Sequence, residues 1–124
     1  MMCYEKLEVY RLSLDCVEHC LNLLDERAKR YSDLCSQLRR AVTSIALNIA
    51  EGAGKTLPRD KGRYYEIARG SAMESAAVCD ILFRMNAIDE PPYQRSKEIL
   101  ERVVAMLSRM CINTEQQARR RNGR

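Results

Sequence analysis

Residues 39–52, RRAVTSIALNIAEG, carry the clearest structural pattern in the sequence. Its apolar side chains recur every three or four positions, as at Ile45 and Ile49, which is the spacing of an amphipathic helix. A polar line that includes Ser44 runs beside this apolar stripe, and the glycine that closes the stretch is a helix-ending residue. The stretch therefore predicts a helix over about residues 33–51 that buries one face.

Three other segments carry the same spacing, and no run of residues alternates with the period of two that a half-buried strand needs. Together the helices are predicted over residues 5–28, 33–51, 58–86 and 89–113. Short connections between four amphipathic helices are typical of an up-and-down four-helix bundle, so the fold class is all-α. Residues 1–113 form this bundle, and the basic tail, residues 114–124, is expected to be mobile because it has no apolar periodicity.

The composition describes one folded domain. The chain has 124 residues, of which 46% are hydrophobic and 31% charged, and this balance excludes an intrinsically disordered protein. No signal peptide and no 18-residue apolar run is visible, so we expect a cytoplasmic protein. Four of the six cysteines lie in apolar helical stretches, where reduced thiols act as small core side chains.

The positive charge is concentrated in particular segments. Residues 27–63 hold nine bases and three acids, whereas residues 1–26 hold two bases and six acids. Such a distribution favours contact with a phosphate backbone, although a basic surface also occurs on proteins that bind no nucleic acid. The predicted nucleic-acid-binding residues are Arg27, Lys29, Arg30, Arg39, Arg40, Lys55, Arg59, Lys61, Arg63, Arg119, Arg120 and Arg121. Tyrosines 64 and 65 follow the basic connection and could stack on bases, or serve as core and interface side chains.

Two polar lines indicate a contact between the second and third helices. Ser44, Asn48 and Glu51 share one helix face, and Ser71 and Glu74 share another beside a mid-helix glycine. We predict that these five residues form a structural polar network, with Arg39 or Arg40 neutralising the carboxylates. The alternative is an acid/base site built from the two glutamates, which lacks an accompanying nucleophile or metal set in the sequence.

Two other patterns are weak. Cys16, His19 and Cys20 lie on one face of the first helix, but a structural zinc site uses four ligands, so core cysteines and a surface histidine are the preferred interpretation. The string GAGKT at residues 52–56 lacks the first glycine of a phosphate-binding loop and follows a helix rather than a strand. The sequence therefore predicts no catalytic residues, no metal and no cofactor.

The second and third helices resemble a known family. The resemblance rests on Arg39-Arg40-Ala41, Ser44-Ile45, Asn48-Ile49-Ala50-Glu51-Gly52, Ile67-Ala68, Gly70-Ser71 and Glu74, with a looser fit at Tyr4, Leu7, Val9 and Tyr10. The chain resembles the four-helix-bundle proteins encoded in intervening sequences of bacterial large-subunit ribosomal RNA genes. The accessory variability proteins of diversity-generating retroelements are similar to these.

The resemblance implies a four-helix bundle that assembles into a homopentameric barrel without enzymatic activity. For the retroelement proteins it also implies a basic surface that binds nucleic acid, and a reverse transcriptase partner. We therefore expect a non-enzymatic, oligomeric accessory protein that binds RNA or DNA through phosphate contacts. In a retroelement-like system this protein would also bind a reverse transcriptase. The alternative is a structural oligomer or protein-interaction scaffold that binds no nucleic acid.

Overall fold

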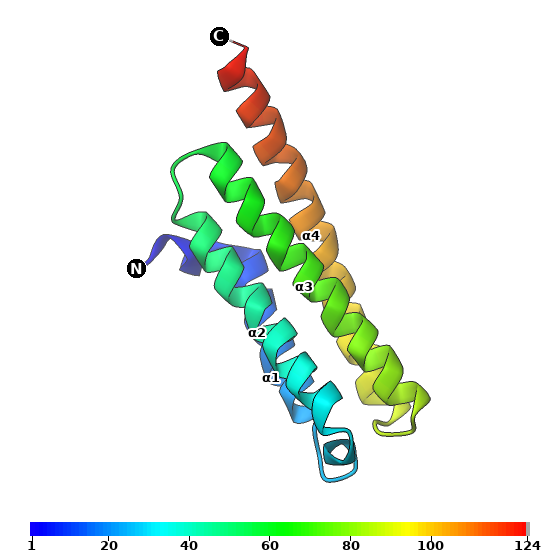
Figure 1. Ribbon diagram of the computed structural model, residues 1–124. Coiled ribbons are helices and arrows are strands. Elements are labelled where there is room, and N and C mark those ends of the chain that lie inside the picture. Colours follow the sequence, from blue (N-terminus) through cyan, green and yellow to red (C-terminus); the bar gives the residue numbers. More distant parts are fainter. Residues whose placement is uncertain (124) are drawn as a thin grey trace.

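Each of the four predicted segments forms a helix in the computed structural model, which describes residues 1–123 (Figure 1). The helices are α1 (Glu8–Asn22), α2 (Ser32–Ala53), α3 (Pro58–Arg84) and α4 (Glu90–Asn122), with 3-10 turns η1 (Cys3–Lys6) and η2 (Ala28–Arg30). No strand occurs in that part of the chain. The prediction of an all-α fold with four helices is confirmed.

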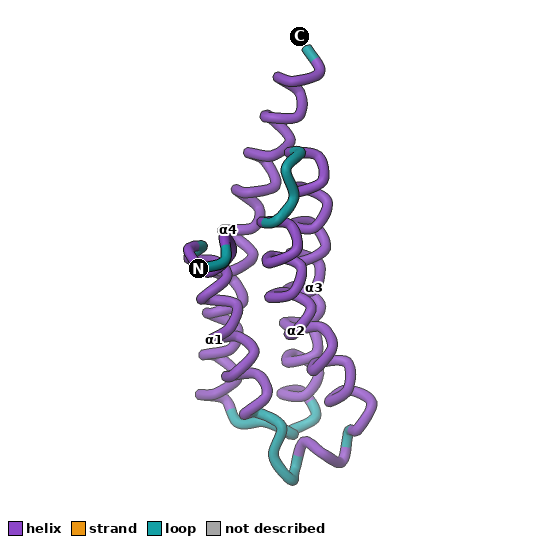
Figure 2. Tube along the Cα trace, turned by 90° about the vertical axis from the view of Figure 1, so that its left-hand side faces the viewer, coloured by secondary structure: helices purple, strands orange, loops and turns teal. Residues whose placement is uncertain are grey.

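The helices run alternately up and down, as Figures 1 and 2 show. Helices α1 and α3 each pack against both α2 and α4, so α1 and α3 occupy diagonal corners of the bundle. The core between them holds the fully buried side chains of Leu38, Ile45, Leu82, Leu100 and Leu107. Across residues 1–123, no helix has both the length and the apolarity needed to cross a lipid bilayer.

The first helix ends earlier than its apolar pattern suggests. Leu23 and Leu24 follow α1 but are only 7% and 8% exposed, because the chain turns inward there instead of continuing as a helix. The carboxylate of Asp25 accepts hydrogen bonds from the backbone N–H groups of Arg27 and Ala28 at 3.0 and 3.1 Å. This local turn, typical of aspartate, competes successfully with one more helical turn.

The last helix is longer than predicted and includes most of the segment expected to be a mobile tail. Helix α4 continues past Asn113 to Asn122, because no proline or glycine interrupts it and Thr114 is buried against α3. Glu115 and Arg119 add an ion pair of 2.7 Å one turn apart on the exposed side. Arg124 lies outside the described residues.

An arginine joins the two connections at one end of the bundle. The guanidinium of Arg27 donates to the Asp89 carboxylate at 2.7 Å and to the carbonyl oxygen of Ala87 at 3.2 Å. These contacts fasten the α1–α2 connection to the α3–α4 connection. In the latter, Asn86 has a positive φ of 58°, which asparagine tolerates better than most residues.

The burial of the cysteines predicts their reactivity. Cys16, Cys20, Cys35 and Cys79 are buried, Cys111 is half-buried and Cys3 is exposed. Burial raises the pKa of Cys16 to about 12, and a hydrogen bond with Cys79 together with burial raises the pKa of Cys20. Because the thiolate is the reactive form, these two thiols stay protonated and inert at pH 8.

We therefore expect an aromatic disulfide reagent at pH 8 to modify Cys3 rapidly and Cys111 more slowly. The four buried thiols are expected to react only after denaturant is added. The absorbance of the released aromatic thiolate, followed over time with and without guanidinium, measures how many thiols react and how fast. Rapid modification of all six cysteines in the native protein would contradict this packing of the core.

Candidate nucleic-acid interface

The structure separates the predicted basic residues into three groups. One group gathers where the α2–α3 connection meets the start of α3 and the end of α4, at the upper end of the molecule in Figure 1. We call this group the basic end; it consists of Lys55, Arg59, Lys61, Arg63, Arg119, Arg120 and Arg121. Arg27, Lys29 and Arg30 lie at the opposite end, and Arg39 and Arg40 lie on the exposed surface of α2.

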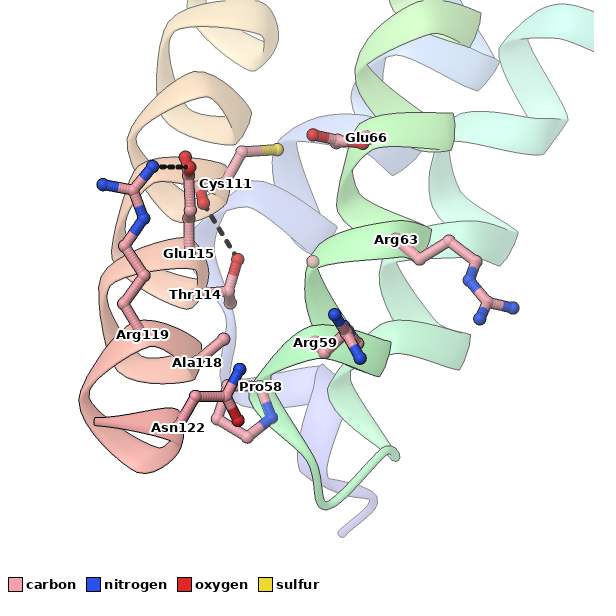
Figure 3. Close-up of a pocket in the computed structure, with 11 residues that line it drawn as sticks. Pro58, Arg59, Arg63, Glu66, Cys111, Thr114, Glu115, Ala118, Arg119 and Asn122 are labelled. Atoms are coloured by element: carbon pink, nitrogen blue, oxygen red, sulfur yellow. Dashed lines mark hydrogen bonds and ion pairs between the residues drawn. The ribbon is translucent and has the colours of Figure 1, made fainter. Parts of the chain in front are cut away.

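A cleft opens within the basic end, between the first turns of α3 and the last turns of α4 (Figure 3). Its volume is about 460 Å³, and Arg59, Arg63 and Arg119 contribute to its wall. Its floor is narrow because Gly62 faces Thr114: a Cβ added to this glycine would lie 2.8 Å from the threonine hydroxyl oxygen. The close approach of the two helices thus depends on Gly62.

Two acids line the same cleft and moderate its charge. Glu115 is engaged by Arg119, and Glu66 reaches into the cleft beside Cys111, while Arg63 points away from α4 (Figure 3). The arginines therefore surround the opening rather than converge on a single point within it. This arrangement suits an extended polyanion that crosses the end of the bundle better than one small anion held inside.

Both lysines at the basic end, Lys55 and Lys61, have structural contacts. The Lys61 ammonium donates to the carbonyl oxygens of Ala53 and Gly52 at 2.9 and 3.5 Å, which satisfies the C-terminus of α2. Lys55 lies 3.9 Å from the Glu51 carboxylate and 5.2 Å from the ring centroid of Tyr64. The side chains best placed to contact a ligand are the exposed arginines.

The tyrosines beside these lysines are not presented for base stacking. Tyr65 is only 5% exposed and belongs to the core, and burial raises the pKa of its hydroxyl. Tyr64 is half-buried, and the Lys55 ammonium lies over its ring. The core alternative for Tyr65 is therefore correct, and the basic end offers charge rather than aromatic surface.

The opposite end holds a smaller basic group. Arg27 is used for the contact between the two connections, and Lys29 pairs with Glu26 at 3.1 Å. Arg30 is exposed. Because Arg27 fastens two loops, its charge is less available to a ligand than the sequence alone suggests.

A polar network does join α2 to α3, but it is built from short side chains. The hydroxyls of Ser44 and Ser71 are 2.8 Å apart, and the Asn48 amide donates to the Ser44 hydroxyl and carbonyl oxygens at 2.9 and 2.8 Å. The buried hydroxyl of Ser75 donates to the Ser71 carbonyl oxygen at 2.8 Å. Three of the five predicted members, together with Ser75, thus make contact.

The two carboxylates lie outside this network, which differs from the prediction. Glu51 and Glu74 are both exposed, as are Arg39 and Arg40, and the nearest base to the Glu51 carboxylate is Lys55. Both carboxylates face solvent instead of being enclosed between α2 and α3. Hydrated carboxylates need no buried partner.

The histidine of α1 has a structural contact. His19 Nε2 lies 3.0 Å from the carbonyl oxygen of Pro92 in α4. Because a carbonyl oxygen only accepts, Nε2 carries the hydrogen and donates this hydrogen bond. Cys16 and Cys20 are 1% and 0% exposed and belong to the core, as preferred from the sequence. Within residues 1–123, no group of three or more potential ligands is arranged to hold a metal ion.

Two glycines of the resemblance have opposite surroundings. At Gly52 a Cβ would lie 2.9 Å from the Tyr65 ring and 3.0 Å from the Tyr64 Cβ, so only glycine fits where α2 meets α3. At Gly70, in the middle of α3, a Cβ would have no heavy atom within 4 Å. Glycine in a helix interior costs about 1 kcal/mol relative to alanine, and this chain's own packing gives no reason for it at Gly70.

The sequence did not indicate several residues of the cleft. Pro58, Gly62, Thr114 and Asn122 line it, yet none carries a charge and three stand in segments that look like ordinary helix or tail. The cleft exists only because α4 continues along α3, and the length of α4 was underestimated. The small residues at positions 62 and 118, where the helices meet, are the available signal.

Comparison with known proteins places the chain in a family. The model of the family described as "23S rRNA-intervening sequence protein" matches residues 5–109, which cover all of α1, α2 and α3 and much of α4. No curated protein matches the chain. The last turns of α4, with their three consecutive arginines, follow the matched region. From the extent of this match, the chain belongs to the 23S rRNA-intervening sequence protein family.

Proposed function

We propose that this chain is a non-enzymatic, oligomeric accessory protein of the cytoplasm that binds RNA through phosphate contacts at its basic end. The observation that carries the proposal is the gathering of two separate basic segments at one end of the bundle. Seven basic side chains lie there with four acids, Glu51, Asp60, Glu66 and Glu115, which leaves a net charge of +3. Charges brought together from separate segments attract a polyanion more strongly than the same charges dispersed.

The chemistry of the basic end favours backbone contacts over base reading. Arginine forms bidentate hydrogen bonds to phosphate oxygens. Besides Arg119, which pairs with Glu115, four exposed arginines stand at this end: Arg59, Arg63, Arg120 and Arg121. The nearby tyrosine rings are buried or covered by a lysine. Binding is therefore expected to depend on charge and shape and to vary little with sequence.

The membership in a family named for a ribosomal RNA gene agrees with an RNA-associated role. From the resemblance to accessory proteins of diversity-generating retroelements, the proposed protein partner is a reverse transcriptase, whose RNA complex the basic end would contact. DNA would be bound by the same phosphate chemistry. Self-association into a closed ring, with five copies as the resemblance implies, would repeat the basic end around an axis.

The test is a fluorescence anisotropy titration with a labelled RNA hairpin at several salt concentrations between 50 and 300 mM. With about four phosphates contacted, we expect a log–log slope of affinity against salt of about −3 to −4. Hairpins of equal length and unrelated sequence should bind within about threefold of each other, because phosphates carry no sequence information. Absence of binding at 50 mM salt would remove the nucleic-acid role.

A structural oligomer without nucleic-acid binding is the second candidate. The observation in its favour is the set of large apolar side chains that remain more than 40% exposed on the helices, namely Leu14, Leu47, Ile67, Met73, Ile81 and Ile112. Contact with another protein would remove such apolar side chains from water, which is favourable. In this case the protein would self-associate normally in the hairpin titration but leave the anisotropy unchanged.

A further inference from the structure

We infer that a second copy of this chain docks the outer face of its α1 helix onto the outer surface of the α2–α3 pair. The inference rests on the self-association proposed above and names the surfaces that produce it. The contact joins two different surfaces of the molecule, one acidic and one carrying arginine, each with an exposed leucine at its middle. The observations below establish the two surfaces in turn.

The receiving surface, here called the docking face, consists of Arg40, Leu47, Glu51, Ile67 and Gly70. The three residues of α2, at intervals of seven and four positions, lie along one side of the helix, and all three are exposed. Leu47 is 68% exposed and Ile67 is 45% exposed, so both aliphatic side chains stand in solvent on neighbouring helices. Each lies about one helical turn from the Ser44–Ser71 hydrogen bond that joins α2 to α3, so the two side chains stand at the same level.

Gly70 gives the docking face room for a close contact. It neighbours Ser71 in the chain and is exposed, and nothing lies within 4 Å of the position that a Cβ would take. A helix interior disfavours glycine, so an absent side chain at this position calls for a reason outside the single chain. A side chain from another molecule can descend there to the backbone of α3.

The inserting surface lies on the outer side of α1. Arg11, Leu14, Asp15 and Glu18 have the spacing of one helix face, and all four are exposed. Leu14 is 44% exposed although the other leucines of α1 and its following turn are buried or half-buried. One aliphatic side chain thus stands among charged neighbours, with a base toward the start of α1 and acids toward its end.

The charges on the two surfaces match in order. In the bundle α1 and α2 run in opposite directions, so along a common axis the sequence Arg11, Leu14, Glu18 opposes the sequence Glu51, Leu47, Arg40. Arg11 and Glu18 are about 10 Å apart along the axis, and Arg40 and Glu51 about 16 Å, a difference that long arginine side chains can span. With Leu14 over Gly70, each end of the contact pairs a base with an acid.

The contact is heterologous, since each copy offers α1 on one side and the docking face on another. Contacts of this kind continue from copy to copy and form a ring where the rotation between copies closes, or an open filament where it does not. Arg40 is then a residue of the subunit interface, which separates it from the arginines of the basic end. Charge complementarity of this sort fixes the choice and register of partners more than it adds affinity.

A charge exchange between the two surfaces tests the inference. Arg40→Glu and Glu18→Arg are each expected to shift the protein at 20 µM from a multiple of the chain mass to the single-chain mass, as measured by light scattering after gel filtration. The double variant restores the pairing with reversed signs and is expected to recover the wild-type mass. Gly70→Gln, which has open space within its own chain, is expected to dissociate the assembly without any change of charge.

Arg102→Glu provides the matched control, because this exposed arginine of α4 lies on neither surface. This control is expected to keep the wild-type oligomer mass. Far-UV circular dichroism should show the same helix content for every variant as for the wild type. The inference is overturned if Arg40→Glu and Glu18→Arg both retain the wild-type mass, or if wild type is itself a single chain at 100 µM. It is also overturned if Arg40→Glu weakens hairpin binding while the mass stays the same, which would assign Arg40 to RNA.

The same measurements separate this inference from the proposed function. If the wild type is an oligomer and the charge-exchange variants keep its mass, the contact does not use these two surfaces. The proposed self-association would still stand in that case. Hairpin binding by a dissociated variant supports the RNA role independently of assembly. A wild-type oligomer that responds to the exchange but binds no hairpin supports this contact and removes the RNA role.

Discussion

Replacing Gly52 by alanine is expected to lower the free energy of unfolding by about 1–3 kcal/mol, the usual cost of overpacking a core. The added Cβ would lie 2.9 Å from the Tyr65 ring and 3.0 Å from the Tyr64 Cβ, distances that require the neighbours to move. Tyr65 cannot move outward easily, since it is 5% exposed and packed in the core. The variant would also separate α2 from α3 near the point where Lys61 completes the end of α2.

Gly54→Ala is the matched control for this variant. The two glycines are two positions apart, and a Cβ at Gly54 would come no closer than 3.6 Å to another atom. Its backbone φ of −81° is open to any residue, so the control is expected to be neutral or slightly stabilising. Urea unfolding followed by circular dichroism measures both differences. Equal stability of the two variants would show that α3 does not approach α2 at Gly52 as closely as described.

The apolar spacing along α2 shows how the sequence predicted the fold. The 3.6-residue spacing of Val42, Ile45 and Ile49 placed them in the core, and all three are fully buried. That spacing is a local property, since a helix with one apolar stripe can bury it in only one direction. The number and type of the elements were therefore predictable, whereas the predicted end was too early, because α2 continues through Gly52 and ends at Ala53.

What the sequence could not predict depends on contacts between distant segments. The early end of α1 depends on how Leu23 and Leu24 enter the core, and the length of α4 depends on Thr114 meeting Gly62. Neither contact leaves a periodic signal in its own segment. For the same reason the sequence predicted which face of α2 carries Glu51, but not that this carboxylate is exposed instead of lying between α2 and α3.

The sequence predicted which basic residues belong to the candidate interface, but not which of their side chains are free to contact a ligand. Lys61 and Arg27 look like surface charges in the sequence, yet one completes a helix terminus and the other joins two loops. Hydrogen bonds to backbone carbonyl oxygens depend on where the chain folds, so a count of basic residues overestimates the charge available to a ligand. The gathering of the end of α4 with the α2–α3 connection is equally a property of the fold.

These contacts identify the arginines to be tested together. Arg59, Arg63, Arg120 and Arg121 are exposed at the basic end, and their replacement by glutamine leaves the bonds of Lys61 and Arg119 in place. The quadruple variant changes the net charge from +4 to 0. Because the four side chains are exposed, thermal melting is expected to remain close to that of the wild type.

Hairpin binding by this quadruple variant is expected to weaken about 10³-fold at 0.1 M salt. Each phosphate contact contributes a factor of about 5 to 8 at that concentration through counterion release, and four contacts are lost. The slope of log affinity against log salt should fall toward zero in the same variant, since few contacts remain to release ions.

A second quadruple variant separates the position of the charge from its amount. Glutamine at Arg84, Arg95, Arg102 and Arg109, all exposed on α3 and α4 away from the basic end, also changes the net charge from +4 to 0. This control is expected to bind the hairpin within about threefold of wild type, because distant charges are screened over a Debye length of about 10 Å. Equal losses in the two variants would mean that the RNA responds to the overall charge, and that the basic end is no binding site.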